Sequence, residues 1–73
     1  MNRRNLKVRE FLRVLKKYGC VEVRSTDHGA IFENPKSNKS TNVPTHRPIL
    51  AVWIYHNILK QLEIKKEEFE NFF

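Results

Sequence analysis

The sequence has few of the residues that stabilise small proteins through covalent or metal cross-links. It contains a single cysteine, Cys20, so no internal disulfide can form. One thiol, with three histidines spread over the chain, has no spacing typical of a zinc site, and we predict no metal and no cofactor. At 73 residues the chain lies near the lower limit for unaided folding. We therefore expect one domain, residues 1–73, held together by packing or by a partner.

Long apolar runs are also missing. The longest, residues 49–55, is far shorter than the about 20 residues that span a bilayer, and no apolar signal core follows the basic N-terminus. We expect a soluble, cytoplasmic protein without a membrane partner. Glycine-rich phosphate loops and Ser/His/Asp arrangements are absent as well, which argues against a nucleotide hydrolase.

Acidic residues are the minority: 14 lysines and arginines face 8 aspartates and glutamates, for a formal charge of +6. Most of the excess lies in residues 1–18, where Glu10 is the only acidic residue. A charge of this size indicates nucleic acid or an acidic protein as the partner. The basic side chains of this segment either contact phosphates or form a solvated surface.

Four apolar residues near the start of the chain follow the spacing i, i+3, i+4 and i+7, which lines one face of a helix. They are Val8, Phe11, Leu12 and Leu15. Asn5 can cap the beginning of this helix, and Gly19 stands where a helix ends. We therefore predict a helix over residues 6–18.

The middle of the chain predicts three short strands. Residues 20–24 and 30–33 are rich in β-branched or aromatic side chains, and a third strand is expected near residues 40–43. Turn-forming residues separate them at 25–29 and 35–38. Short turns join neighbouring strands in antiparallel order, so we predict a three-stranded antiparallel sheet.

A second helical stripe follows Pro48. Its members are Ala51, Ile54, Tyr55, Ile58 and Leu62. The predicted fold class is therefore α+β, a small α-β-β-β-α domain in which both helices pack on one face of the sheet. Eight residues of the two stripes should form the core: Val8, Phe11, Leu12, Leu15, Ile54, Tyr55, Ile58 and Leu62. Three late aromatic residues, Phe69, Phe72 and Phe73, should cover one end of it.

The order of elements and several short segments resemble the HicA family of toxins from toxin–antitoxin pairs. The segments are VREFLRVLKKYGC, NP in the second turn, NVPTH after the third strand, and ILKQLEIKKEEF. The resemblance covers residues 6–69. It implies a fold similar to the double-stranded-RNA-binding domain, and a metal-independent endoribonuclease that cleaves mRNA and is neutralised by a HicB-like antitoxin.

The resemblance also implies a catalytic histidine six residues before the proline of the second turn. Counting back from Pro35 gives Gly29, whereas the nearest histidine is His28. A slip of one residue in a strand turns a side chain to the opposite face. His28 therefore takes the family role only if a bulge at Gly29 corrects the register. Otherwise the catalytic position is empty and the chain is an inactive module that binds RNA or the antitoxin. It is then either a natural inactive relative or a toxin altered to allow its production.

RNA cleavage needs few protein groups because the 2′-OH is itself the nucleophile. His28, beside Asp27, is the candidate base. If a bulge at Gly29 restores the family geometry, we expect its imidazole on the open face of the sheet near Arg24, Lys36 or Lys39. His46 matches a position where the family often has histidine, and Arg47 beside it can hold phosphate. Further candidates for contacts to RNA phosphates are Arg24, Lys36 and Lys39.

The second predicted helix carries one more group of interest. Trp53, His56 and Lys60 fall together on a side away from the apolar stripe. Such a group can stack on a base, but packing against a partner or the core is the preferred interpretation.

Overall fold

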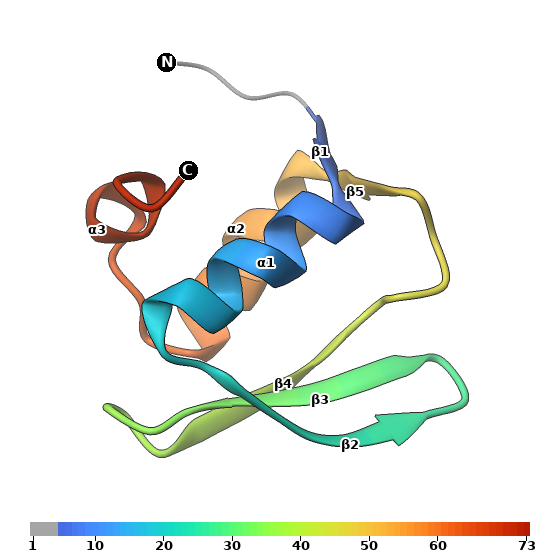
Figure 1. Ribbon diagram of the computed structural model, residues 1–73, viewed down its shortest axis with the longest axis horizontal. Coiled ribbons are helices and arrows are strands. Elements are labelled where there is room, and N and C mark those ends of the chain that lie inside the picture. Colours follow the sequence, from blue (N-terminus) through green and yellow to red (C-terminus); the bar gives the residue numbers. More distant parts are fainter. Residues whose placement is uncertain (1–4) are drawn as a thin grey trace.

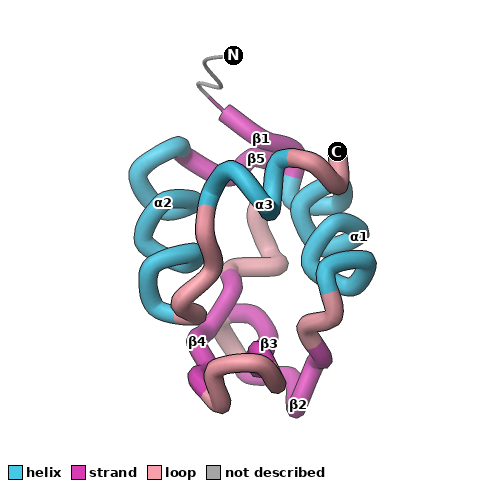
Figure 2. Tube along the Cα trace, turned by 90° about the vertical axis from the view of Figure 1, so that its left-hand side faces the viewer, coloured by secondary structure: helices cyan, strands magenta, loops and turns pink. Residues whose placement is uncertain are grey.

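The computed structural model describes residues 5–73 of the chain. In chain order the elements are β1 (Asn5–Lys7), α1 (Val8–Tyr18), β2 (Val21–Thr26), β3 (Gly29–Asn34), β4 (Lys39–Val43), β5 (Ile49–Ala51), α2 (Val52–Gln61) and α3 (Lys66–Glu70). Strands β2, β3 and β4 form an antiparallel sheet in that order. Both long helices lie on the same side of this sheet (Figures 1 and 2). The predicted α+β class is confirmed. None of the helices within residues 5–73 has the length and apolar character needed to cross a bilayer.

The chain forms a second, two-stranded sheet that the sequence did not reveal. β1 pairs antiparallel with β5, and the buried side chains of Leu6 and Leu50 face each other across this pair. The main-chain N–H of Val8 donates a hydrogen bond of 3.0 Å to the carbonyl oxygen of Pro48. As a result α1 begins two residues later than predicted, with Lys7 in the cap position expected for Asn5. The beginnings of α1 and α2 are thereby joined.

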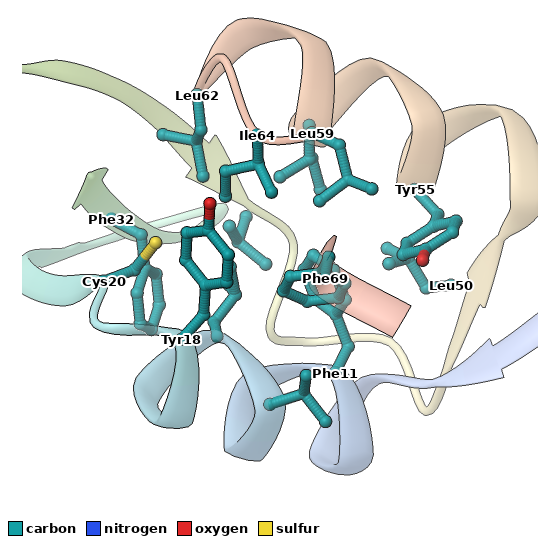
Figure 3. Packing of buried hydrophobic residues seen from close by; sticks show 14 of the residues in the cluster. Phe11, Tyr18, Cys20, Phe32, Leu50, Tyr55, Leu59, Leu62, Ile64 and Phe69 are labelled. Atoms are coloured by element: carbon teal, nitrogen blue, oxygen red, sulfur yellow. The ribbon is translucent and has the colours of Figure 1, made fainter. Parts of the chain in front are cut away.

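The core lies between the sheet and the helices (Figure 3). Six of the eight predicted core residues are buried: Val8, Phe11, Leu15, Tyr55, Ile58 and Leu62. The other two, Leu12 and Ile54, are partly buried at its border. The ring of Phe69 in α3 lies 5.6 Å from Phe11 and 6.0 Å from Tyr55, between the two long helices. The prediction that late aromatic residues cover the core is confirmed for Phe69 and for Phe73, which is partly buried against it, whereas Phe72 is exposed.

The irregularity in the sheet lies in β2. The pairing of β2 with β3 shifts between Glu22 and Arg24, so Val23 is the extra residue of a bulge. Gly29 pairs regularly with Thr26. The bulge at Gly29 on which the family role of His28 was made to depend is therefore not found, and the position of His28 must be explained by the turn itself.

Candidate functional site

A cleft of about 480 Å³ opens beside the turn between β2 and β3. Three parts of the chain form its walls: this turn, the end of β4 with the loop that follows it, and the beginning of α2. The lining residues are His28, Asn42, Pro44, His46, Arg47, Trp53 and Ile54. We call this the histidine cleft.

The antiparallel sheet explains why distant residues meet in this cleft. The turn between β2 and β3 and the end of β4 lie at the same end of the sheet (Figure 1). Residues 44–48 then lead from the sheet towards β5, so His46 and Arg47 lie next to the turn that carries His28. Three of the six predicted catalytic and RNA-binding residues are thus brought together.

Hydrogen bonds fix the backbone of His28. Asp27 and His28 form a two-residue turn between the paired residues Thr26 and Gly29. The Thr26 hydroxyl oxygen accepts a hydrogen bond of 3.3 Å from the main-chain N–H of His28. The same hydroxyl donates one of 3.1 Å to Oδ1 of Asn42 in β4. The turn is therefore tied to the neighbouring strand, and the exposed imidazole is held at the edge of the cleft by its backbone.

Gly29 has no room for a side chain. Its φ of +152° is a conformation that residues with a Cβ atom rarely adopt. A Cβ atom at this position would overlap the carbonyl oxygen of Val43, and would lie 2.9 Å from the carbonyl carbon of that residue and 3.1 Å from Cα of Pro44. The position found by counting back from Pro35 therefore cannot hold a histidine without a movement of β4. Of the two positions, only 28 can present an imidazole to this cleft.

Lys36 and Lys39 lie at the opposite end of the sheet, in the turn between β3 and β4 and at the beginning of β4. The six residues of β3 separate them from His28, which corresponds to roughly 20 Å at about 3.3 Å per residue. The ammonium of Lys36 instead lies 4.5 Å from the ring centre of Tyr18. The expectation that His28 lies near these lysines is wrong.

Arg24 lies closer to the histidine cleft than the two lysines do, but it does not line the cleft. It is exposed on β2 opposite Ile31, which in turn pairs with Asn42. Two strand spacings, about 10 Å, therefore separate the backbone of Arg24 from the cleft wall at Asn42. Of the predicted phosphate-binding lysines and arginines, Arg47 is the one that lines the cleft with His28.

A second cleft of about 440 Å³ lies beside the same loop, towards the beginning of α1. His46 and Arg47 line both clefts. Lys7 and Arg9 add two further cations on this side, while Leu12 provides an apolar wall. We call it the α1 cleft. Cationic side chains thus continue from the histidine cleft to the first turn of α1.

Sequence reasoning missed the roles of Asn42 and Trp53 in the histidine cleft. Trp53 was grouped with His56 and Lys60, but His56 lines a separate pocket together with Leu59 and other residues. A signal was present, because Trp53 stands at the beginning of the helix that follows the segment NVPTH. Within residues 5–73, no three His, Cys, Asp or Glu side chains are grouped closely enough to hold a metal ion.

These observations define a class: a small basic α+β protein whose antiparallel sheet is backed by helices and carries a histidine- and arginine-lined cleft at one end. Comparison with models of protein families identifies the particular family. Residues 8–64 match the model described as HicA toxin of bacterial toxin–antitoxin. The chain therefore belongs to the HicA toxin family, and it is the toxin type of a toxin–antitoxin pair. The comparison with curated proteins gives no match, and neither does the comparison with solved structures.

Proposed function

We propose that this toxin is a cytoplasmic, metal-independent endoribonuclease that cleaves mRNA and is neutralised by a HicB-like antitoxin. The observation that carries the proposal is the histidine cleft, where His28, His46 and Arg47 meet although they belong to separate turns of the chain. Two imidazoles and a guanidinium can supply the base, the acid and the charge stabilisation that cleavage of an RNA phosphodiester uses. Membership of the HicA family supports the same assignment.

The reaction can be written with these groups alone. His28 takes the proton of a 2′-OH, and the oxygen attacks the adjacent phosphorus. The bond from phosphorus to the 5′ oxygen breaks, and His46 gives a proton to this leaving oxygen. The products are a 2′,3′-cyclic phosphate and a 5′-hydroxyl, so atoms and protons balance without a further reactant.

Arg47 supplies the third requirement, stabilisation of the transition state. Negative charge grows on the non-bridging phosphate oxygens as the new bond forms. A guanidinium donates two parallel hydrogen bonds to such oxygens and keeps its charge at any physiological pH. Because Arg47 follows His46 directly, both reach the same phosphate from one loop.

The test is cleavage of an unstructured RNA in the presence of a chelator. The wild-type chain should cut it and leave cyclic phosphate ends, and a 2′-deoxy substitution on the 5′ side of the cut should block the reaction. His28→Ala should lower the rate by about 10²–10⁴-fold, the usual contribution of a general base. The variant should still fold and bind RNA, because His28 is exposed. Full activity of His28→Ala would contradict the assignment.

A second function is favoured by one observation, namely that the family register falls on Gly29, which cannot carry an imidazole. In this case the chain is an inactive module that binds RNA or its antitoxin. A wild-type chain that binds RNA but leaves it intact, and that does not arrest growth when expressed, would support this alternative. Growth arrest that is lost in His28→Ala and relieved by a co-expressed HicB-like antitoxin would support the ribonuclease.

A further inference from the structure

Trp53 has an unusual position for the largest apolar side chain of the protein. It is the single tryptophan of the chain and is 70% exposed. The residues on either side, Val52 and Ile54, are partly buried, so the first turn of α2 is anchored while the indole points outward. Single exposed apolar side chains are common on protein surfaces, so the groups that surround the indole, rather than its exposure alone, indicate a ligand.

The surroundings of the indole indicate the chemistry of this ligand. Trp53 lines the histidine cleft together with His46 and Arg47, and cations continue into the α1 cleft. Sites for single-stranded nucleic acids have this composition, since cations follow the phosphates while aromatic rings stack on the bases. The net charge of +6 favours the same polyanionic ligand.

We propose that Trp53 stacks on the base of an unpaired nucleotide whose phosphate is held by Arg47, so that the histidine cleft selects single-stranded RNA. In a duplex both faces of every base are covered by its neighbours, and no face is offered to the indole. The inference rests on the proposed binding of RNA. It adds the class of substrate and the residue that selects it, and it does not depend on the cleavage step.

The fluorescence of Trp53 gives a direct readout, because no other tryptophan contributes. The probe is a 2′-O-methyl RNA oligonucleotide, which lacks the nucleophile and stays intact. The single strand should quench the fluorescence, and the same sequence annealed to its complement should not. Trp53→Ala should weaken binding of the labelled single strand about tenfold or more and leave duplex binding unchanged. Trp53→Phe, which keeps an aromatic face, should retain most of the affinity.

The matched control is His56→Ala, which removes another exposed ring from the same helix, outside the histidine cleft. It should leave the affinity for the single strand unchanged. Because Trp53 is exposed, its variants should unfold at the same urea concentration as the wild type.

The outcomes separate this inference from the ribonuclease proposal. Quenching by the single strand in a protein that never cleaves RNA would support stacking and overturn the nuclease. Binding of the single strand without a change in fluorescence, or equal losses for single strand and duplex in Trp53→Ala, would overturn stacking alone. No binding of either RNA would overturn both.

Discussion

At the residue scale, the turn that carries His28 depends on a glycine with no space beside it. Gly29 has a positive φ and lies against the main chain of Val43 and Pro44. Gly19, at the end of α1, also has a positive φ, of +120°, but nothing lies within 4 Å of a Cβ atom built on it. At both positions a side chain would strain the backbone, but only at Gly29 would it also meet other atoms. The two positions therefore make a matched pair.

We expect Gly29→Ala to lower the free energy of unfolding by about 3 kcal/mol, because strain and a clash with β4 add together. Gly19→Ala should cost about 1 kcal/mol, from strain alone. Urea unfolding followed by circular dichroism measures both. Gly29→His should be destabilised at least as much as Gly29→Ala and should not gain cleavage activity. Equal losses at positions 19 and 29 would contradict the proposed clash.

At the scale of elements, α1 presents a row of exposed cations, but only its first turn lies near the proposed site. Arg9 lines the α1 cleft together with Arg47 of the loop between β4 and β5. Lys17 lies two turns further along the helix, near its end, and lines neither cleft. If the basic face acts only through its charge, substitution of either residue should weaken RNA binding equally. If a single-stranded RNA passes over residues 44–48, the two substitutions should weaken binding unequally.

Arg9→Ala should therefore weaken binding of single-stranded RNA, whereas Lys17→Ala should change it little. If Arg9 neutralises one phosphate, its removal should also reduce the slope of log affinity against log salt by roughly 0.7. Titrations of a labelled oligonucleotide at several salt concentrations measure affinity and slope together. Equal effects of the two substitutions would show that α1 acts only through its overall charge.

At the scale of the whole molecule, one core joins the sheet to all three helices, and α3 closes it. Phe69 packs between α1 and α2, while the hydroxyl groups of Tyr18 and Tyr55 donate hydrogen bonds to Glu68 and Glu70. Cys20 is buried where α1 leads into the sheet. Burial raises the pKa of this thiol to about 11, and Lys36 opposes the shift only in part.

This raised pKa predicts how the stability of the whole fold depends on pH. Below its ordinary pKa of 9.0, the Cys20 thiol is protonated in the folded and in the unfolded chain. Its stabilising contribution is then complete. Between this value and about 11, the unfolded chain loses the proton and the folded chain keeps it, so the contribution is lost as pH rises.

The measurement compares wild type with Cys20→Ala by urea unfolding, from neutral pH to about pH 11. The two proteins differ only at position 20, so the pH dependence of the difference between their free energies of unfolding reports the thiol and its effect on the pKa of Tyr18. The free energy of unfolding of the wild type should fall relative to that of Cys20→Ala as pH rises above 9. A constant difference would mean that the thiol ionises as easily in the folded chain as in the unfolded one.

The sequence by itself determined the elements that depend on local periodicity. The apolar stripes at helical spacing located α1 and α2 and most of the core, since side chains three or four residues apart must share a helix face. Turn residues and β-branched side chains located β2, β3 and β4. The segments that resemble the HicA family lie within these elements, in α3 and in the turns and loops beside them, and the family is confirmed.

Only the tertiary structure decided which side chains share a site. The pairing of β1 with β5, the bulge at Val23 and the closure of the cleft by Trp53 join segments far apart in the chain or depend on strand register. Spacing along a sequence carries no information on such distances. The same limit explains why Lys36 and Lys39 were placed beside His28: a turn residue is close in sequence, but an antiparallel sheet puts alternate turns at opposite ends.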